Sequence, residues 1–151
     1  MNQRIVLARE LGSYAAVSME AGNLSMVERQ LGNLERADAL AREALAIYQR
    51  RGDEWAMPYG LSGLAAVATE RGELARAARG ELARAATLVG AAEAMMEAQG
   101  AAWPPDERLH YERTVATLTR EMGEPEFARG RAAGRSMSAS DAVPFALGAT
   151  E

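Results

Sequence analysis

The sequence contains no cysteine and no lysine, and its only histidine is His110. Without cysteine there can be no disulfide, no thiolate nucleophile and no cysteine-ligated zinc. Without lysine there can be no Schiff base and no phosphate-binding lysine of the P-loop kind. We therefore expect no enzyme, no cofactor and no metal ion, and we interpret His110 as a solvent-exposed residue of its helix.

Aromatic residues make up only 5% of the 151 residues, and no apolar run approaches membrane-spanning length. The formal net charge of -4 disfavours a nucleic-acid partner, because surfaces that bind phosphates are positively charged. The first ten residues are too short and too charged for a signal peptide. We expect a cytoplasmic protein without a nucleic-acid or membrane partner, whose helices pack through small side chains.

A repeated turn motif divides the first part of the chain. Residues 32–37 read GNLERA and residues 72–77 read GELARA, so the motif recurs after 40 residues (72 minus 32). Apolar residues spaced by three or four positions flank each glycine, as in amphipathic helices. Gly52 is suited to end a helix in the left-handed conformation, and Asp53 is suited to cap the next helix. The pattern predicts helix-turn-helix units.

This motif resembles the tetratricopeptide repeat (TPR), and Ala37 and Ala44 match its two small positions, although its usual period is about 34 residues. The resemblance implies an all-α fold of TPR-like antiparallel helical hairpins, a short α-solenoid with C-terminal capping helices. We expect a single helical-repeat domain over residues 1–151. Its parts are a stub of a preceding helix (1–12), repeat one (13–50), repeat two (53–99) and the capping helices (104–147).

The C-terminal half has a more specific resemblance, to the C-terminal end of large bacterial ATPase and transcriptional regulators. The segments that carry it are Leu88–Ala94, Gly100, Pro104–Pro105, Tyr111–Arg113 and Gly134–Ser138. Such regulators join a signalling ATPase and a DNA-binding or cyclase domain to a tail of helical repeats. The resemblance implies that this chain is a fragment that lacks the ATPase.

The residues that follow the two repeats are expected to form three helices. Pro104 and Pro105 precede an apolar stripe over residues 105–122, and a second helix is expected over residues 125–133. Ser138 with Asp141 resembles a capping box that opens a final helix. These helices would cover the last apolar face of a solenoid.

A perfect tandem duplication is the sharpest local feature, because residues 71–78 and 79–86 both read RGELARAA. Within one helix, eight extra residues would turn everything beyond them by about 80°. Three outcomes are open: Gly72 forms the turn, Gly80 forms the turn, or both glycines lie in one long helix. We favour a hairpin that turns at Gly80, because Ala85 and Ala92 then repeat the spacing of the small positions.

Any of these outcomes lengthens the helices beyond their original partners. Leu74 or Leu82 would then be exposed unless a second chain covers it. We expect a homodimer, which a domain swap through the duplicated segment would also produce.

The resemblance also implies a binding groove, because the first helix of each TPR hairpin lines a concave surface. The matching residues here are Met19, Met26, Arg29, Gln30, Tyr59, Ser62, Thr69 and Glu70. This mixture suits an extended peptide or a helix, through apolar and charge-assisted contacts. The other interpretation is an ordinary solvated helical face.

These observations predict a non-catalytic protein–protein interaction or scaffold module, a fragment of a bacterial signalling or transcriptional regulator. The expected partner is a protein or a peptide. The alternative is a domain that senses a ligand or peptide and controls a missing ATPase or DNA-binding domain.

Overall fold

The computed structural model describes residues 3–74 and 79–148, and all regular structure within these two ranges is α-helical. The all-α prediction is confirmed for this part of the chain. The helices are α1 (Gln3–Glu10), α2 (Tyr14–Gln30), α3 (Leu34–Arg51), α4 (Met57–Leu74), α5 (Arg79–Ala98), α6 (Pro105–Met122), α7 (Glu124–Arg135) and α8 (Ala139–Leu147). No helix within these ranges is long and apolar enough to cross a membrane.

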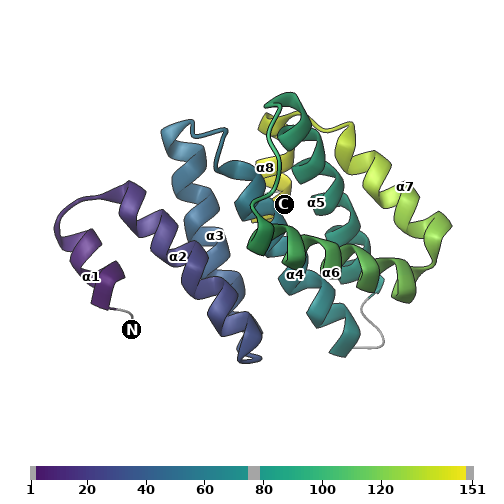
Figure 1. The fold of residues 1–151 in the computed structure, drawn as a ribbon, viewed down its shortest axis with the longest axis horizontal. Helices are drawn as coiled ribbons and strands as arrows, with labels where there is room; N and C mark the ends of the chain where they lie inside the picture. The colour runs from purple at the N-terminus through teal and green to yellow at the C-terminus, as the bar shows by residue number, and fades with distance from the viewer. Residues whose placement is uncertain (1–2, 75–78, 149–151) are drawn as a thin grey trace.

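The first five helices pack one upon the next, and α2 with α3 and α4 with α5 form the closest pairs (Figure 1). The α2–α3 pair is held across its interface by the Ser25 hydroxyl, which donates to the carbonyl oxygen of Ala37 at 2.7 Å. Gly52 ends α3 in the left-handed conformation with φ +64°, as its sequence context predicts. The Asp53 carboxylate then accepts a hydrogen bond from the Ala56 backbone N–H at 3.2 Å. Local glycine and capping chemistry therefore sets the reversal between α3 and α4.

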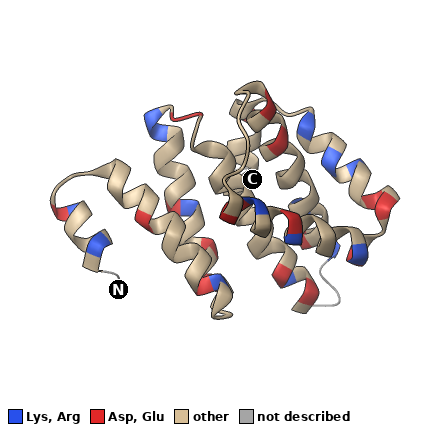
Figure 2. Cartoon of the chain, in the orientation of Figure 1, with Lys and Arg blue, Asp and Glu red and all other residues tan. Residues whose placement is uncertain are grey.

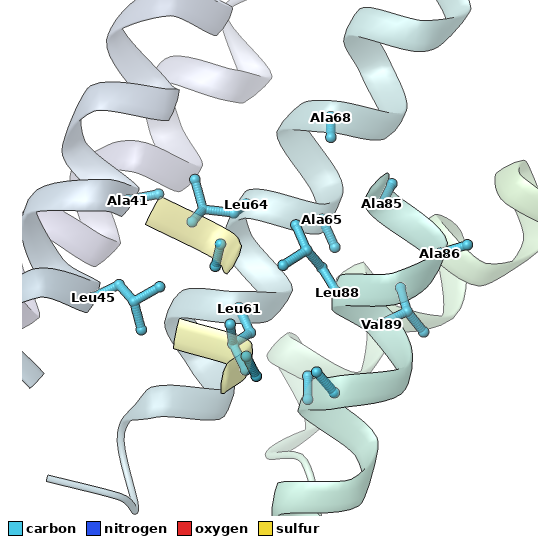
Figure 3. Close-up of a cluster of buried hydrophobic side chains, with 14 of the residues drawn as sticks. Ala41, Leu45, Leu61, Leu64, Ala65, Ala68, Ala85, Ala86, Leu88 and Val89 are labelled. Atoms are coloured by element: carbon cyan, nitrogen blue, oxygen red, sulfur yellow. The ribbon is translucent and has the colours of Figure 1, made fainter. Parts of the chain in front are cut away.

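The main core lies between α4 and α5 and is built from leucine and alanine (Figure 3). Leu61, Leu64 and Leu88 are fully buried, and Ala65 and Ala85 fill the space between the helix backbones. Small side chains allow two helices to approach closely, and leucines then fill the remaining volume. This is the small-residue packing that the composition predicts.

Of the C-terminal helices, α6 crosses α4 and α5, α8 contacts α3, α4 and α5, and α7 packs on α5 at the end of the row (Figure 1). The approach of α7 to α5 is very close, because a Cβ placed on Gly134 would lie only 1.9 Å from the carbonyl oxygen of Thr87. α6 spans the residues predicted for it, and α7 is slightly longer than predicted. Ser138 caps α8 by accepting a hydrogen bond from the Asp141 backbone N–H at 3.3 Å, which confirms the predicted cap.

The prediction that Gly80, or alternatively Gly72, forms the turn of the second hairpin is wrong. Gly72 lies in the last turn of α4 and Gly80 in the first turn of α5, and neither has a positive φ. α4 continues past Gly72 to Leu74, and α5 begins at Arg79 before Gly80, while residues 75–78 lie outside the described residues. One long helix is also wrong, because α4 and α5 pack against each other.

The two copies of the octapeptide occupy different environments. A Cβ placed on Gly72 would lie 2.4 Å from a methyl carbon of Leu82, whereas one placed on Gly80 would meet nothing within 4 Å. Leu74 is 79% exposed and its counterpart Leu82 only 9% exposed. Gly72 in the first copy thus accommodates Leu82 of the second copy.

These environments predict opposite effects for the same substitution at equivalent positions. We expect Gly72→Ala to lower the free energy of unfolding by about 1–3 kcal/mol, because the new methyl group displaces Leu82. We expect Gly80→Ala to raise it by about 0.5 kcal/mol, because alanine is the better helix former at an open position. Urea unfolding of both variants beside the parent chain measures the difference, and equal effects would contradict the packing described here.

Candidate functional site

Two adjoining cavities lie between α2 and α4, with α6 along one side. The first, of about 380 Å³, has a floor of small residues from α3 and α4, including Ala41, Ala44, Gly60 and Gly63. The second, of about 430 Å³, is lined mainly by polar and charged side chains. Both are bordered by Arg29, Ala66, His110 and Thr114. We call them the apolar cavity and the polar cavity, and together the α2–α4 groove.

The structure brings all eight predicted groove residues to these two cavities. The apolar cavity is lined by Met19, Met26, Arg29, Tyr59 and Ser62, and the polar cavity by Arg29, Gln30, Thr69 and Glu70. The helical spacing on α2 and α4 turns these residues toward one another across α3. Their role in binding a partner remains a prediction.

The wall formed by α6 is the part of the groove that the sequence analysis missed. Glu107, His110 and Thr114 border the apolar cavity from this helix. They follow one another at intervals of three and four residues, so they share one face of α6. That spacing was the available signal, but a polar helical face is ordinarily solvated, and only the docking of α6 places it at the groove.

Arg29 connects the three helices around the groove. From α2 its guanidinium donates one hydrogen bond to the Glu70 carboxylate on α4 and forms an ion pair there. Its second terminal nitrogen lies 3.3 Å from Nδ1 of His110 on α6. Only 15% of the Arg29 side chain is exposed. The planar guanidinium of Arg29 therefore links α4 and α6 at the border between the two cavities.

The prediction that His110 is solvent-exposed is wrong, because its ring is half-buried at the border of both cavities. Burial lowers the pKa of His110, and the neighbouring charges of Arg29 and then Arg113 lower it further, against a smaller opposing effect of Asp106. An arginine can only donate, so Nδ1 accepts from Arg29 and the proton of the neutral ring is on Nε2. The groove thus contains a neutral histidine with an N–H donor.

Two further titratable groups, Glu107 and Tyr59, border the apolar cavity. Burial raises the pKa of Glu107, and the charge of Asp106 adds to this effect while Arg29 opposes it. Burial also raises the pKa of Tyr59, to which the charges of Glu107 and Asp106 contribute.

Charged residues of both signs follow α6 and the adjoining ends of α2 and α4 (Figure 2). Within residues 3–74 and 79–148, no group of three histidine, aspartate or glutamate side chains is placed to hold a metal ion. The groove is suited to recognition by shape, apolar contact and hydrogen bonding.

A second polar cluster holds α6 from the side of α5 and α7. Glu93 on α5 is buried and accepts hydrogen bonds from the Tyr111 hydroxyl, from Arg131 at 2.8 Å and from Arg135 at 3.0 Å. Tyr111 stacks on Trp103, which in turn meets the edge of the Tyr59 ring, with 5.4 Å between centroids in both pairs. This cluster joins α5, α6 and α7 and so positions the α6 wall.

Comparisons with known proteins give no family assignment. No protein-family model, curated protein or solved structure matches the chain. The groove and its surroundings are therefore the basis for the functional proposal.

The lowered pKa of His110 predicts how stability responds to acid. The unfolded chain, with a histidine pKa near 6.5, binds this proton at a higher pH than the folded chain does. The contribution of His110 to stability is therefore complete above that value and decreases as the pH falls toward the folded-state pKa. His110→Gln keeps an acceptor for Arg29 but cannot titrate.

We expect the parent chain to lose more thermal stability than His110→Gln between about pH 7.5 and about pH 5.5. Thermal unfolding of both proteins across this range measures the difference, and carboxylate titration affects both alike. Equal losses would show that His110 has its ordinary pKa in the folded protein.

Proposed function

We propose that the chain is a non-catalytic protein-interaction module that binds a short segment of a partner protein in the α2–α4 groove. The observation that carries this proposal is the joining of an apolar cavity to a polar cavity across Arg29, Ala66, His110 and Thr114. A peptide segment with an apolar side chain beside a polar one would match both. The small, apolar and hydrogen-bonding side chains of the lining support binding as the function.

The proposal includes a TPR-like arrangement of the hairpins, within a fragment of a bacterial signalling or transcriptional regulator. The burial of Ala37 and Ala44 supports it, because these are the small positions at which paired TPR helices meet. The packing of each of the first five helices on the one before also supports it. A cytoplasmic location belongs to the same proposal, since a chain without cysteine makes no use of an oxidising compartment.

A second candidate function is the sensing of a small molecule or peptide that controls a separate ATPase or DNA-binding domain. The size of the apolar cavity, about 380 Å³, favours it. Small-molecule sites commonly enclose about 300–1,000 Å³ and are lined mainly by apolar groups with a few polar ones. In this case the ligand would occupy the apolar cavity alone.

A bulky side chain placed in the apolar cavity tests whether peptides bind there. Ser62 lines the apolar cavity without being fully buried, so Ser62→Trp places an indole in the cavity and leaves the core intact. We expect peptides selected by the parent chain from a phage-displayed library of short random sequences to bind this variant at least about tenfold more weakly. Fluorescence anisotropy with the labelled selected peptides measures the affinity.

Ala128→Trp is the matched control, because Ala128 is an exposed residue of α7 outside the groove. We expect the control to bind the selected peptides as the parent does. Selection of no peptide, or equal binding by Ser62→Trp, would overturn the peptide-binding function. Thermal stabilisation by a metabolite from a screened panel, lost in Ser62→Trp, would then support the sensing function.

A homodimer remains part of the proposal. Leu74 at the end of α4 is the most exposed of the large apolar side chains in the described ranges, which supports its coverage by a second chain. We expect light scattering at micromolar concentration to give twice the 16.2 kDa of one chain, and Leu74→Gln to give the single mass. A single mass for the parent chain would contradict the dimer.

A further inference from the structure

The polar cavity is lined by more arginine side chains than carboxylates, so one arginine has no ion-pair partner there. Arg29 pairs with Glu70, and Arg120 pairs with Glu73 at 2.8 Å, so both carboxylates of the cavity wall already have arginine partners. The remaining cation, Arg113, is exposed and forms no ion pair or hydrogen bond with any residue in the ranges 3–74 and 79–148. The cavity therefore has an excess of positive charge at Arg113.

A second donor lies three residues away on α6, at the border of both cavities. Nδ1 of His110 accepts from Arg29, which leaves the Nε2–H without an acceptor among the described residues. Arg113 lies close enough to His110 for its charge to disfavour protonation of the ring. A guanidinium and a neutral imidazole N–H thus both remain available to a ligand at one end of the groove.

We infer that the polar cavity binds an acidic side chain of the partner segment, next to an apolar side chain that enters the apolar cavity. This inference rests on the proposed peptide-binding function and specifies the chemistry of the partner. A carboxylate only accepts hydrogen bonds, so it matches the donors of Arg113 and His110 and forms a charge-assisted contact with Arg113. A basic side chain would be repelled by Arg113 and would find Glu70 and Glu73 already paired.

The apolar cavity would bind the apolar side chain that lies next to the acidic residue in the partner segment. Its floor consists of glycine and alanine residues of α3 and α4, and Met19 and Met26 border it from α2. Methionine side chains adapt to apolar groups of different shape. The acidic residue of the partner would therefore be specified more strictly than the apolar residue beside it.

Replacing Arg113 by an uncharged residue tests the acidic preference without altering the rest of the groove. Short random peptides displayed on phage are selected in parallel on the parent chain, on Arg113→Gln and on Arg129→Gln. Arg129 is the matched control, because it is an exposed arginine of α7 that also forms no ion pair within the described ranges. We expect aspartate or glutamate next to an apolar residue to be enriched by the parent and by Arg129→Gln, but not by Arg113→Gln.

Affinity measurements then test the contact itself. The best peptide is synthesised with its acidic residue and with the corresponding amide, asparagine or glutamine. On the parent chain and on Arg129→Gln the acidic peptide should bind about fivefold more tightly than the amide, and on Arg113→Gln the two should bind alike. This double-mutant cycle isolates the contact from any general effect of either substitution.

The outcomes separate the inference from the function on which it rests. Selected peptides without an acidic preference, or an acidic preference that persists in Arg113→Gln, would overturn the inference while peptide binding stands. Selection of no peptide by the parent chain would overturn the proposed function, and the inference with it.

Discussion

The close approach of helix backbones through small side chains is the constraint on which the rest of this structure depends. Ala65 and Ala85 separate α4 from α5, and Gly134 lets α7 lie against the backbone of α5. Such contacts leave no room for a further methyl group, so each interface fixes the position of its helices tightly. The same kind of residue borders the groove, because Gly60 lets α4 approach Leu45 of α3, whose Cβ would lie 3.0 Å from a Cβ placed on the glycine.

Charged residues act together with the burial of Leu118 in the main core to position α6. Arg29 ties it to α2 and α4 through His110 and Glu70, and Glu93 ties it to α5 and α7 through Tyr111 and the two arginines of α7. Every cation in the chain is an arginine, whose fork of donors serves two acceptors at once, as Arg29 does. Fixing α6 from both sides turns an otherwise solvated polar face into a wall of the groove.

The helix ends could be predicted from neighbouring residues in the sequence. The position of α6 could not, because it depends on contacts with helices far away in the sequence. Helix ends at Gly52 and Ser138 follow from backbone and capping preferences that depend only on neighbouring residues. The groove residues of α2 and α4 could be placed because the repeat sets their spacing across α3. The positions of α6 and His110 could not, because they depend on contacts between residues about 80 positions apart, such as that of His110 with Arg29.

The two copies of the octapeptide begin in different helices, although their sequences are identical. Eight residues inserted into one helix would rotate everything beyond them, but here the copies are divided between the end of α4 and the start of α5. Glu73 of the first copy reaches Arg120 of α6. Glu73 therefore brings to the wall of the polar cavity a carboxylate that already has an arginine partner, whereas Arg113 in the same wall forms no ion pair with any described residue.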